Sequence, residues 1–122
     1  MQLMNNSILK QQYIDSLDAT FSAIFNADLI EYVSGETILR QGEKISYLYL
    51  LMRGKVKIYS TSIEGKRLIV AFNKPVQLFG DIEFLQQSDI LNTVEALGTV
   101  HMLRFSITEA KRLQKRDLMS IY

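Results

Sequence analysis

The chain has 122 residues, a length that fits one domain with a core of its own. Hydrophobic residues make up 48% of the sequence and charged residues 22%, the composition of an ordinary globular protein, which excludes a disordered chain. The net charge of +1 argues against a surface laid out for nucleic acid, and the lack of cysteine excludes disulfides, thiol nucleophiles, zinc fingers and cysteine-held iron-sulfur clusters.

The N-terminal segment predicts helices rather than a targeting signal. Its first ten residues lack the charged start and apolar centre of a signal peptide, and no later apolar run approaches the ~20 residues of a membrane span. We therefore expect a cytoplasmic protein without a membrane contact. Residues 6–26 carry apolar side chains spaced by three or four, which predicts one or two amphipathic helices covering one end of the core: Ile8, Tyr13, Ile14, Leu17, Phe21, Ile24 and Phe25.

The region from 29 to 105 changes to short β-prone runs separated by six glycines. This pattern of short strands separated by glycines is typical of an antiparallel roll or barrel. Gly65 in "SIEGKR" predicts a hairpin turn. In "KVKIY", alternation places Val56 and Ile58 on one face, and Lys55, Lys57 and Tyr59 on an outer, solvated face. The predicted strands are 29–33, 37–41, 47–53, 55–61, 67–73 and 93–105.

A C-terminal helix is predicted for residues 107–122. Ser106 and Glu109 have the spacing of a capping box. The basic residues that follow at helical spacing indicate a solvated side of the helix: Lys111, Arg112, Lys115 and Arg116. The chain ends at Tyr122 without a capping signal, and we expect the natural protein to continue beyond it.

Catalytic patterns are nearly absent. His101 is the only histidine, lies in a predicted strand and has no nucleophile signalled nearby, so a partly buried structural role is favoured. A cupin metal centre requires several histidines, which makes a cupin-like enzyme the weakest interpretation. Asp81 and Glu83 are two residues apart and should point away from each other on a helix. We expect neither a metal nor a cofactor, and no enzyme.

The most informative stretch is "FGDIEFLQQSDILNTVEA", residues 79–96. Gly80 ends an apolar run and Asp81 begins a possible short helix. Unpaired amides at a helix start, reached past a glycine, can make a small anion site. Most strand-glycine-helix junctions hold no ligand, so this signal has little weight alone.

The sequence around this stretch strengthens the case for a ligand site, because many of its features occur in the order of a known family's sequence pattern. They include Gly35 with Glu36, then Gly42, "LMRGKVKIY" around Gly54, the turn glycine Gly65, Pro75 before "FGD", and "TVEA" at 93–96. From 29 to 105 the chain resembles the cyclic nucleotide-binding domain at the front of Crp/Fnr-type bacterial transcription regulators. The resemblance implies a mainly β fold with flanking helices: a double-stranded β-helix, or jelly roll, in one domain spanning 1–122.

In that family, amides of the short helix and an arginine nine places after its glutamate hold the cyclic phosphate, while the glutamate binds the ribose hydroxyl. Here Asp81 replaces the glutamate, Val76 and Gln77 replace a Gly-Asp pair, and Ile90 replaces the arginine. No lysine or arginine lies between Lys74 and Arg104. We expect Ile90 and Leu91 to pack inward. The resemblance implies these ligand-contacting positions: Val70, Ala71, Phe79, Gly80, Asp81, Ile82, Ile90, Leu91 and Thr93.

The resulting hypothesis is the sensor and dimerisation half of a Crp/Fnr-like regulator that does not respond to cyclic AMP. It leaves three inputs open: an unidentified small-molecule effector other than cyclic AMP, a protein contact, or none. It also implies a homodimer of the full-length protein, and DNA binding only through a C-terminal domain absent from this chain. A stand-alone cyclic nucleotide-binding signalling module is the alternative.

Overall fold

The computed structural model describes residues 1–17 and 26–115. Within this part of the chain the order is β1 (Gln2–Leu3), α1 (Ser7–Asp15), β2 (Asp28–Tyr32), β3 (Thr37–Leu39), β4 (Tyr47–Thr61), β5 (Arg67–Asn73), β6 (Gln77–Phe79), α2 (Asp81–Gln86), β7 (Thr93–Ser106) and α3 (Ile107–Lys115). The predicted mainly β fold with flanking helices is confirmed. The rest of the predicted N-terminal helical region, and residues 116–122 of the predicted C-terminal helix, lie outside the described residues.

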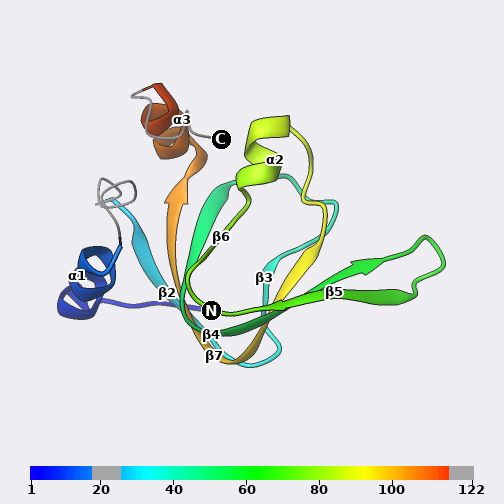
Figure 1. Ribbon diagram of the computed structural model, residues 1–122, viewed down its shortest axis with the longest axis horizontal. Coiled ribbons are helices and arrows are strands. Elements are labelled where there is room, and N and C mark those ends of the chain that lie inside the picture. The colour runs from blue at the N-terminus through cyan, green and yellow to red at the C-terminus, as the bar shows by residue number, and fades with distance from the viewer. Residues whose placement is uncertain (18–25, 116–122) are drawn as a thin grey trace.

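Two long antiparallel strands, β4 and β7, form the frame of the roll. They pair from Tyr47 with Ser106 to Tyr59 with Thr93, within a sheet of order β1-β2-β7-β4-β5. β6 adds to the first half of β4, and β3 to the first half of β7. In Figure 1 the β4–β5 hairpin projects to one side, while α2 and α3 lie at the top. The antiparallel roll expected from the sequence is therefore present.

β4 runs without interruption where the sequence predicted two strands. Its pairing with β7 shifts register on both sides of Arg53, next to Gly54 at φ +95°. A Cβ at Gly54 would collide with the carbonyl oxygen of Thr99 and with Val100. Only glycine permits both the bend and this close approach.

One prediction for β4 was wrong. Tyr59 is buried, at 6% exposure, and Ile58 is only partly buried, although alternation from Val56 assigned Tyr59 to the solvated face. The pairing of β4 with β5 shifts register between Ile58 and Tyr59. The extra residue lies in β5, where Val70 has no partner, and β4 keeps its register with β7 at both positions, so the shift does not turn Tyr59 inward. Tyr59 is instead covered by the Arg67 guanidinium, 4.5 Å from its ring centroid, and by the Lys57 ammonium, 5.5 Å from it.

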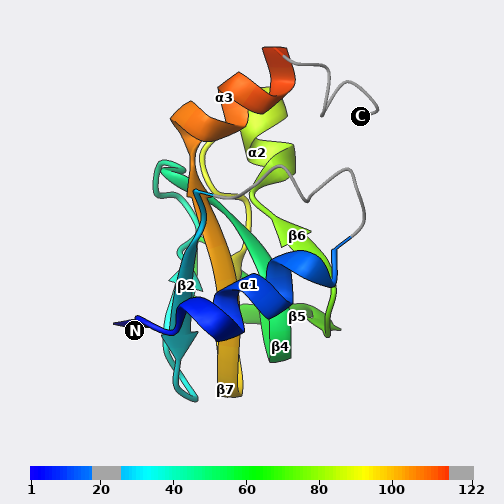
Figure 2. The ribbon, with the colours of Figure 1, turned by 90° about the vertical axis from the view of Figure 1, so that its left-hand side faces the viewer.

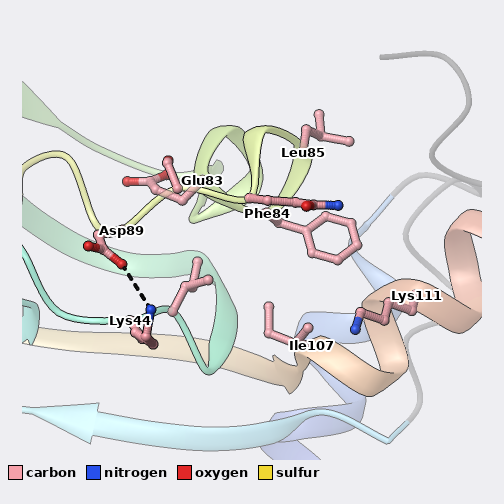
Figure 3. Close-up of a pocket in the computed structure, with 10 residues that line it drawn as sticks. Lys44, Glu83, Phe84, Leu85, Asp89, Ile107 and Lys111 are labelled. Carbon is pink, nitrogen blue, oxygen red and sulfur yellow. Dashed lines mark ion pairs between the residues drawn. The ribbon is translucent and has the colours of Figure 1, made fainter.

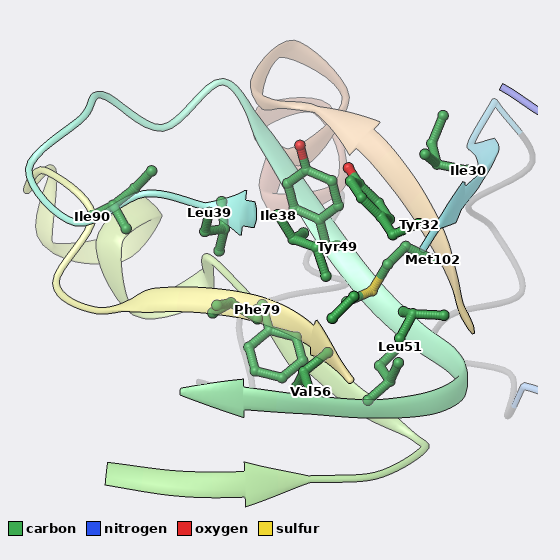
Figure 4. Packing of buried hydrophobic residues seen from close by; sticks show 13 residues of the cluster. Ile30, Tyr32, Ile38, Leu39, Tyr49, Leu51, Val56, Phe79, Ile90 and Met102 are labelled. Carbon is green, nitrogen blue, oxygen red and sulfur yellow. The ribbon is translucent and has the colours of Figure 1, made fainter. Parts of the chain in front are cut away.

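The first half of β4 is buried on both faces, which explains its continuous apolar run. Tyr49 and Leu51 belong to a cluster inside the roll (Figure 4), whereas Leu48 and Leu50 belong to a second cluster. Ile14 of α1 and Ala110 of α3 are buried in this second cluster. Figure 2 shows α1 in front of the strands and α3 across their top. The helices therefore cover the outer face of the sheet, whereas the sequence predicted only that the N-terminal helices cover one end of the core.

A side-chain hydrogen bond caps the N-terminus of each flanking helix, α1 and α3. The Asn6 side chain accepts from the Leu9 N–H at 3.0 Å, and Ser106 Oγ accepts from the Glu109 N–H at 3.1 Å. The second bond is the one that the capping-box spacing predicted. Glu109 also pairs with the guanidinium of Arg112, which raises the Arg112 pKa.

His101 is a buried structural residue, at 6% exposure. Its Nδ1 lies 2.7 Å from the hydroxyl of Tyr13 on α1, and its Nε2 lies 3.0 Å from a carboxylate oxygen of Glu31 on β2. One β7 side chain thus links the N-terminal helix to a neighbouring strand. The described residues contain no cluster of three or more histidine, aspartate or glutamate side chains able to hold a metal, and no helix long and apolar enough to cross a membrane.

Candidate functional site

The candidate site begins where β6 passes into α2 through Gly80. This residue has φ +94°, and a Cβ there would lie 2.6 Å from the Ile45 side chain and 3.0 Å from that of Leu48. The turn therefore needs a glycine for its conformation and for its tight packing. It directs the first turn of α2, with Asp81 and Ile82, toward the segment before β7.

A cavity of about 240 Å³ lies between the start of α2, β6 and that segment. We call it the cradle. Its walls are mainly apolar, with three amide side chains and two carboxylates among them. The lining consists of Leu39, Ile58, Asn73, Gln77, Leu78, Phe79, Gly80, Asp81, Ile82, Glu83, Leu91, Asn92 and Val94.

Asp81 and Glu83 both border the cradle, although their spacing of two residues predicts side chains that point apart. Burial raises the pKa of the Asp81 carboxyl, and the charge of Glu83 adds to this rise. Hydrogen bonds from the α2 amides of Asp81 and Ile82 act in the opposite direction. Both residues can border one cavity because this cavity extends around the first turn of the short helix.

Glu83 is the residue that sequence reasoning undervalued. It is 8% exposed, and one of its carboxylate oxygens accepts a hydrogen bond from the Leu91 N–H at 3.1 Å. The resemblance places a cyclic phosphate against the cassette amides and an arginine at position 90. Glu83 therefore puts an anionic group of the protein itself beside that position. The available signal was a second acidic residue in a short helix without a lysine or arginine.

Ile90 packs inward, as expected. It is 6% exposed and belongs to the cluster inside the roll, with Leu39 beside it in Figure 4. Its backbone is held on both sides, because Ile90 N–H donates to the Glu43 carbonyl and the Ile90 carbonyl accepts from Gly42 N–H. Leu91 does not pack inward. It is 47% exposed at the edge of the cradle, so the prediction for Leu91 was wrong. Adjacent residues in this extended segment point to opposite sides.

No lysine or arginine is among the described residues that line the cradle. Two lysines outside the cradle lining form ion pairs with carboxylates. Lys44 Nζ lies 3.6 Å from the Asp89 carboxylate, in an exposed ion pair. Lys57 Nζ pairs with Glu95 at 3.3 Å. The cradle is therefore negatively charged, without the positive group that an anionic ligand needs.

The structure brings together some of the nine sequence-predicted site residues. Phe79, Gly80, Asp81, Ile82 and Leu91 line the cradle. Ile90 lies in the core, and Thr93 is buried, where its hydroxyl accepts from the Gln41 N–H at 3.1 Å.

Val70 and Ala71 lie elsewhere, on β5, with Val70 55% exposed, and they do not line the cradle. The lining residues that were not predicted come from β3, β4, β5, β6, β7, the segment before β7 and α2 itself, and all except the α2 residue are brought to α2 by tertiary packing. They are Leu39, Ile58, Asn73, Gln77, Leu78, Glu83, Asn92 and Val94.

A second cavity, of about 450 Å³, lies between α2 and α3 and shares Glu83 with the cradle. Figure 3 shows Phe84 and Ile107 facing each other across it, with Lys111 on α3 and the Lys44–Asp89 pair on the other side. Ser88 also lines it, and the buried Ser88 hydroxyl has no hydrogen-bond partner. This cavity has a larger volume than the cradle, and its lining mixes exposed residues with buried and partly buried ones.

Comparisons with known proteins agree with this geometry. The profile of the cyclic nucleotide-binding domain family matches residues 29–117. The cyclic AMP receptor protein of Thermus thermophilus is 33% identical over 72 residues, which cover 59% of this chain and 33% of that protein. Regulatory protein YeiL of Escherichia coli O157:H7 is 21% identical over 95% of this chain and 50% of its own length. The chain thus spans half or less of these curated relatives.

Solved structures share the fold. The sensor domain of the transcriptional regulator DNR from Pseudomonas aeruginosa has a TM-score of 0.75 at 23% identity, covering 93% of this chain and 83% of that one.

Two regulatory subunits of a cAMP-independent protein kinase A are also similar. That of Trypanosoma cruzi, bound to guanosine, has a TM-score of 0.75 at 19% identity, covering 90% of this chain and 42% of that one. That of Trypanosoma brucei has a TM-score of 0.68 at 21% identity, covering 79% of this chain and 36% of that one. The latter is a variant bound to cAMP, with a glutamate changed to alanine, a threonine to arginine seven residues later, and the next residue, a valine, to alanine.

The glycine-hinged roll, the α2 cradle and the family match over residues 29–117 lead to one assignment. The chain belongs to the cyclic nucleotide-binding domain family.

Proposed function

We propose that this chain is the sensor part of a Crp/Fnr-like transcription regulator, and that it does not respond to cyclic AMP. One observation carries the proposal: the position of the family's phosphate-binding arginine is a buried isoleucine, and the next amide already donates to Glu83. The cradle therefore offers a cyclic phosphate a carboxylate where it needs a cation.

The free energy of the missing arginine–phosphate contact is large enough to decide the affinity for a cyclic nucleotide. A hydrogen bond to a charged group contributes about 1.5–3 kcal/mol, or about one to two powers of ten in affinity. A cyclic phosphate would also face two carboxylates across a partly buried cavity, where repulsion exceeds its value in bulk water. Both effects act against anionic ligands, and no lining cation among the described residues offsets them.

The Trypanosoma brucei variant supports this interpretation. Its three substituted positions have the spacing of Glu83, Ile90 and Leu91 in this chain. In a protein described as cAMP-independent, the cAMP-bound form is one in which the glutamate has been removed and an arginine introduced. The same two features, an acidic residue and a missing arginine, occur together here.

The remainder of the function concerns the whole regulator. The chain covers half or less of its curated relatives, and the DNA-binding part would follow it in sequence. Dimerisation of the full-length protein, DNA binding through that part and a cytoplasmic location belong to the same proposal. An effector in the cradle would act by changing how α2 and α3 pack, shifting the population of DNA-binding-competent molecules.

Isothermal titration calorimetry with cyclic AMP and cyclic GMP tests the proposal. The unmodified chain should show no binding up to millimolar nucleotide. The double variant Glu83→Ala, Ile90→Arg should bind cyclic AMP at least about tenfold more tightly, because it removes the carboxylate and restores the cation.

The matched controls separate the two changes. Ile90→Arg alone should gain less, since the new guanidinium would pair with Glu83, and Glu83→Ala with Ile90→Leu should gain nothing. Thermal melting verifies that each variant is folded. Micromolar binding of cyclic AMP to the unmodified chain would refute the proposal, whatever the variants do.

A further inference from the structure

The chemistry of the cradle points to a specific ligand class. We propose that it binds an uncharged nucleoside, whose ribose hydroxyls donate to Asp81 and Glu83. The inference rests on the proposed function, because it assumes that the cradle is still a ligand site. It differs from the family pattern in one respect: a protein carboxylate replaces the anion that the ligand would otherwise bring.

The polar groups of the cradle require hydrogen-bond donors on the ligand. An ionised carboxylate only accepts hydrogen bonds, and one oxygen of Glu83 already receives the Leu91 N–H. Its other lone pairs remain for a bound molecule, as do those of Asp81 that the Asp81 and Ile82 amides do not use. Hydroxyl groups supply donors without adding negative charge, whereas a phosphate would supply only acceptors.

The apolar part of the lining favours a flat ring over a flexible amine. Ile82 is 53% exposed and Leu91 47% exposed, and both border the cradle. Large aliphatic side chains left exposed beside a cavity gain free energy when a ring covers them, at about 25 cal/mol per Å² of apolar area buried. Asn73, Gln77 and Asn92 provide donors and acceptors of the kind that pair with the edge of a base.

The size of the cradle limits the ligand. Its volume of about 240 Å³ lies below the ~300–1,000 Å³ of pockets that enclose drug-sized molecules. One nucleoside with its ring partly outside fits this space, but a dinucleotide does not. A metal ion is disfavoured, since the described residues supply no third carboxylate or histidine beside Asp81 and Glu83.

Calorimetry with adenosine, guanosine and inosine tests the inference on the whole chain. At least one of them should bind, and its 2′,3′-dideoxy analogue should bind about tenfold or more weakly, because it lacks the donors for the carboxylates. The 5′-monophosphate of the same nucleoside should also lose about tenfold or more, through repulsion by Glu83.

Variants assign the contacts. Asp81→Asn and Glu83→Gln should each weaken nucleoside binding about tenfold, and Glu83→Gln should reduce the discrimination against the 5′-monophosphate. Glu64→Gln is the matched control, since this exposed hairpin residue changes the same charge far from the cradle. Its affinity should equal that of the unmodified chain.

The outcomes separate this inference from the proposed function. If no nucleoside binds and cyclic AMP does not bind either, the nucleoside inference fails while the cAMP-independent sensor stands. If cyclic AMP binds tightly, the proposed function fails first. Binding of putrescine without nucleosides would show that the carboxylates select a cation, and would overturn the inference.

Discussion

At the residue scale, the candidate site keeps groups that oppose folding. Asp81 and Glu83 place two carboxylates beside one partly buried cavity, and Gly80 holds the turn that brings them there. Sites that bind ligands often retain such unfavourable groups, because the ligand, rather than the fold, satisfies them. Substituting Asp81 measures how much stability such a carboxylate costs the folded protein.

The substitution Asp81→Asn should raise the melting temperature at pH 7. Burial and the Glu83 charge raise the pKa of Asp81, so the ionised form is disfavoured in the folded state. The stability that the neutral form provides is present below the ordinary pKa of 3.8 and is lost as the pH rises through the higher folded pKa. Asparagine stays neutral and can still accept from the α2 amides.

The gain should be a few degrees at most, because solvent screens this half-buried group. It should shrink toward zero as the pH falls below the ordinary value for aspartate. Melting curves of both proteins across this pH range provide the measurement, with Glu64→Gln as the control for a change in net charge. A gain that persists unchanged in acid would show that the carboxylate charge is not responsible.

At the element scale, β4 and β7 decide the shape of the roll, and the bend in β4 depends on one residue. Gly54 combines a positive φ with a backbone that approaches Thr99 and Val100 too closely for a Cβ. Gly65 has a similar φ of +83° but open space around it. A comparison of substitutions at Gly54 and Gly65 therefore separates the effect of backbone strain from that of steric collision.

The substitution Gly54→Ala should lower the free energy of unfolding by about 2–5 kcal/mol. Left-handed backbone strain contributes about 1–2 kcal/mol, and overpacking about 1–3 kcal/mol. Gly65→Ala should lower it by only about 1–2 kcal/mol, since strain acts there alone. Urea unfolding followed by circular dichroism measures both. Equal losses in the two variants would argue against the bend as the source of the difference.

At the scale of the whole molecule, helices and roll are joined through packing on the outer face of β4 and through His101. This imidazole lies between the Tyr13 hydroxyl of α1 and the Glu31 carboxylate of β2. The N-terminal helix is thereby attached to the sheet by a buried polar contact in addition to apolar packing. Removing that contact should loosen α1 without unfolding the roll.

The substitution Tyr13→Phe should lower the free energy of unfolding by about 1–3 kcal/mol. It keeps the ring but leaves the buried Nδ1 of His101 without its partner. In hydrogen exchange, the amides of α1 should exchange faster while those of β4 and β7 keep their protection. Ile8→Ala, at a 73% exposed position on the same helix, should change the unfolding free energy by no more than about 0.5 kcal/mol. Unchanged exchange in α1 would show that the Tyr13–His101 contact does not hold the helix.

The sequence alone determined the roll, its turn at Gly65 and the cap at Ser106, because each depends on neighbours in the chain or on a glycine's backbone. It also predicted the inward packing of Ile90, whose side chain is apolar, although distant residues hold Ile90 in place. Tertiary structure decided the burial of Tyr59, the exposure of Leu91 and the composition of the cradle. The contact of Arg67 with Tyr59 and the meeting of β3, β5 and β6 with α2 depend on packing between different elements, which no local period contains. The contact between Glu83 and the Leu91 amide also depends on tertiary structure. Together with the missing arginine, this contact indicates that the cradle disfavours an anionic ligand.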